Sequence, residues 1–147
     1  MLCPALSMRA GPGAQHLLGY DLLETKMAKY KLVVMSGPKA GCEDEYNDWY
    51  NNQHLADVVS VPGFRSAQRF KLTDAMGFEH RHGYMAIYEI ESDDPKAVLA
   101  EMFKRSGTPA MVLSESLDLE KAVVGLFEPC SPVVEAGAKP RKMAAAR

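Results

Sequence analysis

The segment at residues 43–60 limits what this 147-residue chain can fold into more than any other part of it. Tyr46, Tyr50, His54 and Val58 recur there at every fourth position, which places them on one face of a helix. Three acidic residues open the segment, where carboxylates complement the positive end of a helix dipole. The spacing predicts an amphipathic helix whose aromatic face must be buried against another layer.

Strand-like segments lie on both sides of this helix. We expect strands at residues 29–36, 64–73, 83–91 and 121–128, and a second helix at residues 95–106. The order β-α-β-β-α-β is typical of the ferredoxin-like unit. The predicted fold class is therefore α+β, with a four-stranded antiparallel sheet and both helices on one of its faces.

The alternation along the strand at residues 64–73 predicts two separate faces. One face is expected to carry Phe64, Ser66, Gln68 and Phe70, and the other Arg65, Ala67, Arg69 and Lys71. The apolar stripe of the second helix is expected to contain Ala97, Val98, Met102 and Phe103.

A sheet covered by helices on one side leaves its second face open. In a domain of about 100 residues an open apolar face would favour aggregation. Two copies that pack these faces together remove the problem. We therefore expect a homodimer that forms through the sheet face.

The two ends of the chain differ in composition from the segment between them. Residues 1–26 are rich in proline and glycine without a sustained period, and predict an irregular N-terminal extension. Met27 is then the expected natural start, although a genuine N-terminal arm is the alternative. Residues 131–147 are basic and predict a flexible tail. The folded domain is expected at residues 27–130.

Composition argues against several classes of partner. A formal net charge of −2 gives no reason to expect nucleic acid, and there is no apolar run long enough for a membrane span. The three cysteines form no CxxC pair, which favours reduced thiols in the cytoplasm. His80 and His82 lack a third ligand of metal-site type, so neither a metal nor another cofactor is expected.

His54 and Tyr50 are the leading candidates for catalysis. His54 is the one imidazole on the apolar face of the first helix, and the usual histidine pKa near 6.5 suits proton transfer at neutral pH. Tyr50 lies one turn earlier, within reach of His54. Such a pair could move a proton beside a ligand carbonyl. The alternative is a histidine that packs under the helix and bonds to backbone.

Four further residues are candidates for ligand binding. Tyr46 and Trp49 either line an aromatic pocket or fill the core, as aromatic stripes usually do. Arg69 either holds a carboxylate or phenolate of the ligand or forms a salt bridge between chains. Tyr84 lies on a strand of which one face should meet the helices.

Residues 45–70 resemble the dimeric α+β barrel superfamily, and in particular its EthD-like branch. The resemblance rests on Trp49-Tyr50, on His54, on the Pro-Gly-Phe motif at residues 62–64 and on Arg69-Phe70. Many relatives carry proline two residues after the histidine, where this chain has Ala56. That departure weakens the match at the loop-facing end of the helix.

The resemblance implies two paired sheets that form a dimeric barrel, and it is compatible with several reactions because fold does not determine chemistry. Relatives include cyclases, isomerases and monooxygenases without metal, and some cyclases use a histidine with a tyrosine. The first hypothesis is an enzyme of cofactor-free acid/base chemistry, a cyclase, isomerase, lyase or monooxygenase, that acts on an aromatic or polyketide-like carbonyl compound. The alternative is a non-catalytic binding or accessory protein of a degradation or biosynthesis pathway, which holds a hydrophobic small molecule.

Overall fold

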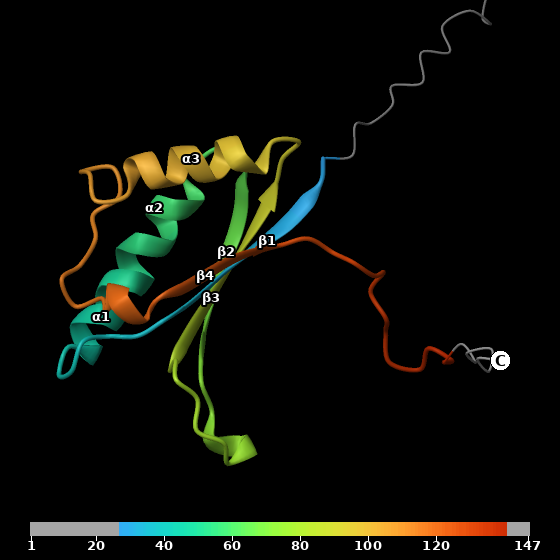
Figure 1. Ribbon diagram of the computed structural model, residues 1–147, viewed down its shortest axis with the longest axis horizontal. Coiled ribbons are helices and arrows are strands. Elements are labelled where there is room, and N and C mark those ends of the chain that lie inside the picture. The colour runs from blue at the N-terminus through green and yellow to red at the C-terminus, as the bar shows by residue number, and fades with distance from the viewer. Residues whose placement is uncertain (1–26, 141–147) are drawn as a thin grey trace, which may run out of the picture.

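The computed structural model describes residues 27–140, which form one four-stranded sheet with helices. In chain order the elements are β1 (Lys29–Ser36), α1 (Glu43–Trp49), η1 (Tyr50–His54), α2 (Leu55–Val59), β2 (Phe64–Lys71), η2 (Asp74–Met76), β3 (Tyr84–Glu91), α3 (Pro95–Arg105), η3 (Leu119–Lys121) and β4 (Val123–Phe127) (Figure 1). The strands lie in the order β2-β3-β1-β4, and every neighbouring pair is antiparallel. This arrangement confirms the predicted ferredoxin-like α+β fold. The expected N-terminal extension at residues 1–26, and residues 141–147 of the tail expected at residues 131–147, lie outside the described residues.

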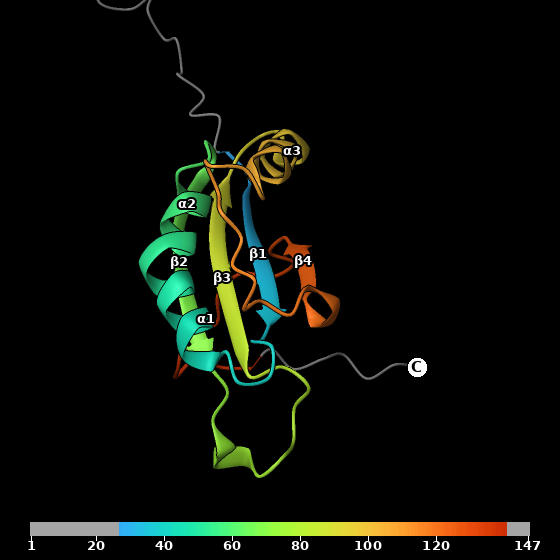
Figure 2. The ribbon, with the colours of Figure 1, turned by 90° about the vertical axis from the view of Figure 1, so that its left-hand side faces the viewer.

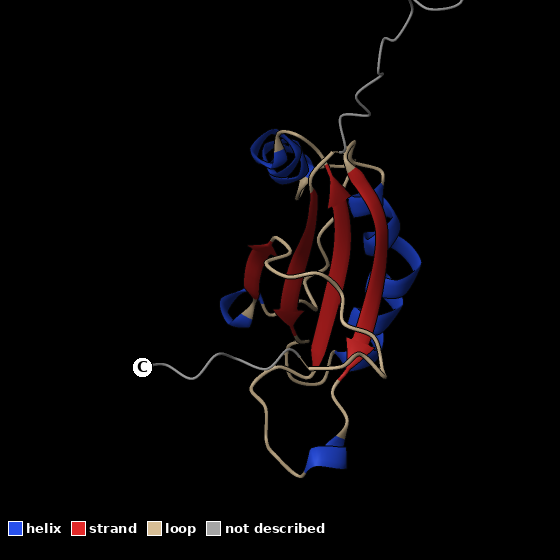
Figure 3. Ribbon diagram, turned by 90° about the vertical axis from the view of Figure 1, so that its right-hand side faces the viewer, coloured by secondary structure: helices blue, strands red, loops and turns tan. Residues whose placement is uncertain are grey.

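The helices cover one face of the sheet, as predicted. The rod formed by α1, η1 and α2 runs along β2 and β3, and α3 lies nearer β1 (Figure 2). Leu32, Tyr88 and Ile90 point toward these helices and are almost fully buried. No described helix covers the opposite face of the sheet (Figure 3). Among residues 27–140 there is also no helix that is long and apolar enough to cross a membrane.

One predicted strand face is wrong at its first residue. Phe64 pairs with Ile90, but Ser66 pairs with Glu89, so a register shift separates Phe64 from Ser66. Such a bulge adds one residue to the strand and reverses the alternation beyond it. Phe64 therefore packs on the helix side against Tyr88, with ring centroids 6.0 Å apart, whereas Ser66 lies on the open side. From residue 66 onward the predicted alternation agrees with the observed register.

The first helix is also not the uninterrupted α-helix that its spacing predicts. At η1 the backbone widens to a π-helix, in which the N–H of Leu55 donates to the carbonyl of Tyr50, five residues earlier. A π-turn contains one residue more than an α-helical turn, so it changes which of the following side chains face the sheet. Such turns are frequent at functional sites. Trp49 and Tyr50 are both buried together with Tyr46, at the i, i+3 and i+4 positions of an ordinary helix face, and the π-turn shifts the residues that follow them.

Helix α3 begins as the sequence predicts and buries a narrower stripe. Asp94 accepts a hydrogen bond from the N–H of Ala97 at 3.0 Å, and Pro95 occupies the first turn. Val98 and Met102 are buried, but Phe103 is 62% exposed. The expected stripe is therefore wrong at Ala97 and Phe103, which are both exposed, because the helix turns only Val98 and Met102 fully toward the sheet; Phe103 lies in the lining of a pocket.

Candidate functional site

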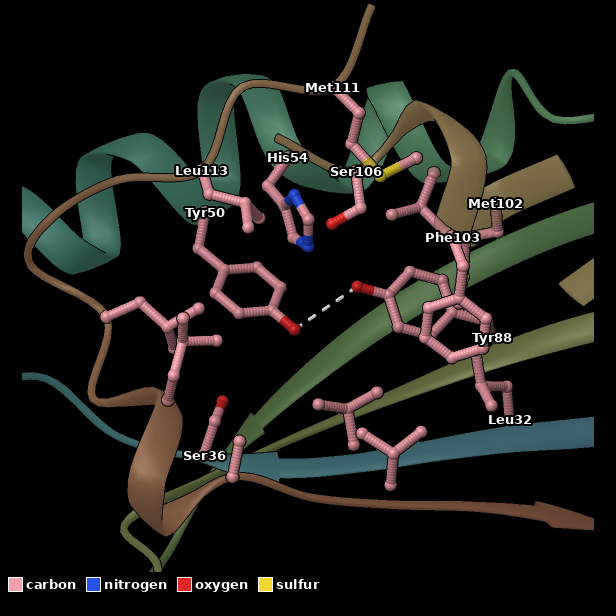
Figure 4. A pocket seen from close by; sticks show the side chains of 16 residues that line it. Leu32, Ser36, Tyr50, His54, Tyr88, Met102, Phe103, Ser106, Met111 and Leu113 are labelled. Carbon is pink, nitrogen blue, oxygen red and sulfur yellow. Dashed lines mark hydrogen bonds between the residues drawn. The ribbon is translucent and has the colours of Figure 1, made fainter. Parts of the chain in front are cut away.

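A pocket of about 140 Å³ lies between η1, the sheet and the chain that connects α3 to β4. Figure 4 shows the side chains that line it. Most of them are apolar, and the polar ones are Ser36, Tyr50, His54, Tyr88 and Ser106. The lining contains no lysine, arginine, aspartate or glutamate. Its chemistry therefore suits an uncharged and mostly apolar molecule that carries one or two polar atoms.

The connection from α3 to η3 forms one wall of this pocket. It is held across the first helix by the indole N–H of Trp49, which donates to the carbonyl oxygen of Val112 at 3.0 Å. The N–H of Lys39 donates to the carbonyl oxygen of Ser116 at 2.7 Å, and the hydroxyl of Ser114 donates to Glu45 at 3.3 Å. These contacts bring Met111, Leu113 and Leu117 against the pocket.

His54 projects into the pocket from η1 (Figure 4). Its ring stacks on Trp49 with centroids 4.5 Å apart and meets the edge of Tyr50 at 4.9 Å. Its buried Nδ1 has no hydrogen-bond partner within the described part of the chain. Burial, helped by the positive charge of Arg69, lowers the pKa of His54 from 6.5 to about 4. The imidazole is therefore neutral at pH 7.

The hydroxyls of Tyr50 and Tyr88 meet beside this imidazole (Figure 4). The Tyr88 hydroxyl donates to the Tyr50 oxygen at 3.2 Å, and Ser36 is a second polar neighbour of the Tyr50 hydroxyl. Burial raises the pKa of both phenols, so both stay protonated at neutral pH. A neutral imidazole and a protonated phenol thus face the same small space.

The structure brings together the two predicted catalytic residues but not the four predicted ligand-binding residues. Trp49 lies behind His54, with its indole N–H on Val112. Tyr46 is fully buried, and its hydroxyl pairs with Ser36 Oγ at 2.8 Å. Neither Tyr46 nor Trp49 lines the pocket. Their direct contact with a ligand remains a prediction, and in this structure they support the residues that do line it.

Arg69 and Tyr84 lie on the far side of Tyr50 from the pocket lining. The Arg69 guanidinium faces the helix, where it donates to the side-chain oxygens of Asn51 at 2.6 Å and Asn47 at 3.0 Å. The Tyr84 hydroxyl donates to Glu43 and accepts from Asn47 Nδ2. Arg69 is thus on the helix side of the sheet, away from the open face that an interchain salt bridge would use.

Three polar groups of the site have no specific role assigned by the sequence alone. Tyr88 shares a strand face with Tyr84 and Ala86, and this parity is the available signal for its helix-facing position. Ser36 and Ser106 end a strand and a helix, and no periodicity marks such positions. Residues 110–120 have no clear pattern, so the wall that they form could not be anticipated.

The low pKa of His54 predicts how stability depends on pH. The unfolded chain binds a proton at His54 near pH 6.5, and the folded protein does so only near pH 4. Between these values the unfolded state holds more protons, so the free energy of unfolding falls by roughly 3 kcal/mol as the pH drops through that window. Urea unfolding at pH 7 and pH 4 should show this loss in the wild type and a smaller one in His54→Leu. The same pH dependence in both proteins would contradict the buried, neutral imidazole.

The strand order and the arrangement of the helices together define a fold. A ferredoxin-like sheet of order β2-β3-β1-β4, with a pocket under its first helix and an uncovered second face, is the subunit architecture of the dimeric α+β barrel proteins. Within residues 27–140, no group of three or more histidine, cysteine, aspartate or glutamate side chains is placed to hold a metal ion.

Comparison with solved structures supports this fold assignment. The At3g17210 protein from Arabidopsis thaliana matches with a TM-score of 0.54 and 19% identity, over 71% of this chain and 99% of that one. A candidate monooxygenase from Shewanella loihica PV-4 matches with a TM-score of 0.51 and 15% identity, over 72% and 98% of the two chains. A scan against protein-family models and a search of curated proteins found no match. At these identities the likeness establishes the fold alone.

Proposed function

We propose that this protein is a small-molecule enzyme that moves a proton beside a carbonyl or phenolic oxygen without a cofactor. The observation that carries the proposal is the neutral His54 imidazole beside the hydroxyl of Tyr50 in an apolar pocket. Such a reaction needs a base and a hydrogen-bond donor that is directed at the substrate oxygen, and both must face the same pocket.

The size and charge of the pocket narrow the substrate. An apolar cavity of about 150 Å³ is sufficient for benzene, and this pocket measures about 140 Å³. A lining without charged side chains disfavours carboxylates and phosphates, because nothing there would replace their hydration. We therefore propose a neutral, single-ring substrate with an enolisable carbonyl or a phenolic hydroxyl, which is the smaller end of the aromatic and polyketide-like range.

In the proposed reaction, His54 accepts a proton from the carbon beside the carbonyl, or from the phenolic oxygen. The electron pair left behind is delocalised onto the substrate oxygen as an enolate or phenolate. The Tyr50 hydroxyl donates a hydrogen bond to that oxygen, and Tyr88 orients Tyr50 by its own hydrogen bond. Cyclisation, isomerisation, elimination and cofactor-free oxygenation all begin with this step.

One observation favours a non-catalytic binding or accessory role instead. General bases work best when their pKa lies near the working pH, and that of His54 lies at about 4. A base this weak suits a hydrogen-bond acceptor for a ligand hydroxyl at least as well as a proton acceptor. Binding without turnover is therefore the second candidate function.

A ligand screen separates these possibilities. Neutral single-ring phenols, cyclic ketones and lactones are compared with the corresponding carboxylates by thermal shift, since a ligand that binds only the folded state raises the melting temperature. Compounds that stabilise the protein are then assayed for exchange of their acidic proton with deuterated water by NMR. Binding with exchange supports the enzyme, and binding without exchange supports the accessory role. No stabilisation by any neutral compound, or a preference for carboxylates, would contradict the proposed ligand class.

We also propose that two copies pair through the open sheet face. The apolar side chains there are Val33, Met35, Phe70, Met85, Ile87, Val123 and Phe127. Phe70, Val123 and Phe127 are between 39% and 59% exposed, which is unusual for side chains of this kind in a stable monomer. A second copy of the same face would cover them with one two-fold operation.

The Ile87→Asp variant tests this dimer. Ile87 lies near the middle of the open face, opposite Val33 on β1 and Gln68 on β2. A buried carboxylate without a partner in the interface costs several kcal/mol, so the variant is expected to sediment as a monomer at concentrations where the wild type is a dimer. Glu115→Gln on the helix side serves as the control. An unchanged mass for Ile87→Asp would contradict pairing through this face.

A further inference from the structure

Arg69 is surrounded by tyrosine rings. Its guanidinium carbon lies 4.2 Å from the ring centroid of Tyr50, 5.1 Å from that of Tyr46 and 5.0 Å from that of Tyr84. At such distances the positive charge is attracted to the electron-rich face of each ring. Tyr50 is the nearest of the three, and it is also the ring whose hydroxyl faces the pocket.

The charge of Arg69 has no acidic counterpart among residues 27–140. Its hydrogen bonds go to the neutral amide oxygens of Asn47 and Asn51, and its buried Nε has no partner. The neighbouring carboxylate, Glu43, is engaged by Lys71 at 3.5 Å and by Tyr84. An arginine held without an ion pair beside a candidate active site therefore leaves net positive charge behind Tyr50.

We infer that Arg69 is a positioning residue, which acts through the ring of Tyr50 to stabilise negative charge on the ligand oxygen that Tyr50 contacts. This inference rests on the proposed function. The guanidinium of the half-buried Arg69 lies over the Tyr50 ring outside the pocket lining, and the ligand would contact the Tyr50 hydroxyl within it. Charges near such a partly buried site interact more strongly than in bulk water. The pocket lining has no charged side chain and therefore suits a neutral ligand. The positive charge of Arg69 behind Tyr50 favours the enolate or phenolate that forms once the ligand has lost its proton.

The same arrangement explains why the imidazole and the phenol of the site differ in their response to Arg69. Its charge opposes protonation of His54 and favours ionisation of Tyr50, so it contributes to a low pKa at His54 and offsets part of the rise in the pKa of Tyr50. A positive charge thus keeps the base unprotonated and strengthens the hydrogen-bond donor, which are the states that the proposed first step requires.

The first test uses 4-nitrophenol, a single-ring phenol whose phenolate has its own visible absorbance band. Absorbance titrations with the purified wild type give the affinities for the phenol and the phenolate from their dependence on pH. In Arg69→Gln, affinity for the phenolate is expected to fall roughly tenfold relative to the phenol. Arg69→Lys, which keeps the charge, should recover part of this preference. Arg65→Gln is the matched control, because Arg65 lies on the same strand and pairs with Glu91 at the surface.

The second test needs no ligand. The titration of His54, followed by NMR of its ring protons, should move to higher pH in Arg69→Gln and stay unchanged in Arg65→Gln. Arg69→Met, of similar length and uncharged, replaces the glutamine variant if that variant does not fold.

An unchanged His54 titration without Arg69, or an unchanged ratio of phenolate to phenol affinity, would overturn the role of Arg69. A wild type that fails to bind 4-nitrophenol at all would instead count against the proposed ligand class. The two failures are therefore distinguishable, because the His54 titration still decides on Arg69.

Discussion

The His54→Ala variant is expected to lose roughly a hundredfold to ten-thousandfold of the turnover of whichever substrate the ligand screen identifies, because a positioned general base contributes about that much. His54 is the only base among the residues that line the pocket, so no neighbour can replace it. The loss should appear in kcat, since removal of a proton acceptor acts on the transition state more than on ground-state binding. Steady-state rates of wild type and variant with the same substrate measure it.

Two controls accompany this experiment. His80→Ala removes an exposed imidazole from the loop between β2 and β3 and should leave turnover unchanged. Circular dichroism and sedimentation of His54→Ala should match the wild type, because the ring is at the edge of the core and α2 continues from it. Wild-type turnover in a folded His54→Ala protein would remove the proposed mechanism and leave the accessory role.

Replacing Trp49 with alanine is expected to lower the free energy of unfolding by about 3–5 kcal/mol, the range for large buried aromatic side chains. Trp49 is only 8% exposed, stacks on His54 and donates to the carbonyl of Val112. Its loss opens a cavity under the base and releases the wall formed by residues 107–118. Urea unfolding monitored by far-UV circular dichroism, which does not depend on the lost indole, measures the change.

The Trp49→Phe variant separates packing from the hydrogen bond. It keeps an aromatic ring beside His54 but leaves the Val112 carbonyl without its donor, and should cost about 1 kcal/mol. If Trp49→Phe were as destabilising as Trp49→Ala, the hydrogen bond to the wall rather than the stacked ring would be the main contribution. If Trp49→Ala cost less than 1 kcal/mol, the packing described here would be wrong.

Element order and element type were accessible from the sequence because the signals that encode them are local. The four-residue spacing from Tyr46 to Val58, the alternation along residues 83–91 and the Asp94-Pro95 start of α3 each depend on residues close together in the chain. These signals predict the order β-α-β-β-α-β, and that order limits the plausible topologies to few. The helix that carries Tyr50 and His54 was therefore predictable.

The local irregularities were not accessible in the same way. No residue type at positions 50–54 requires a π-helix. The bulge position holds Arg65 and not the glycine that often marks a bulge in a sequence. Both features lie where the first helix packs against the sheet, and that contact depends on two elements together. The bulge shifts the strand by one residue, and this is why Phe64 faces the helices. The π-turn adds one residue to the helix before His54 and α2.

By itself the sequence determined the fold class, the helix that bears His54 and the uncovered apolar sheet face, since hydrophobic period and burial are set by neighbouring residues. Only the tertiary structure decided that the hydroxyl of Tyr88 meets that of Tyr50, that Ser36 and Ser106 border the same space and that Arg69 lies behind the pocket. These groups come from different strands and helices, and strand order, register and the π-turn determine which of them meet. The chemistry of a site depends on the distances between these groups. The hydrophobic period along the chain does not encode those distances.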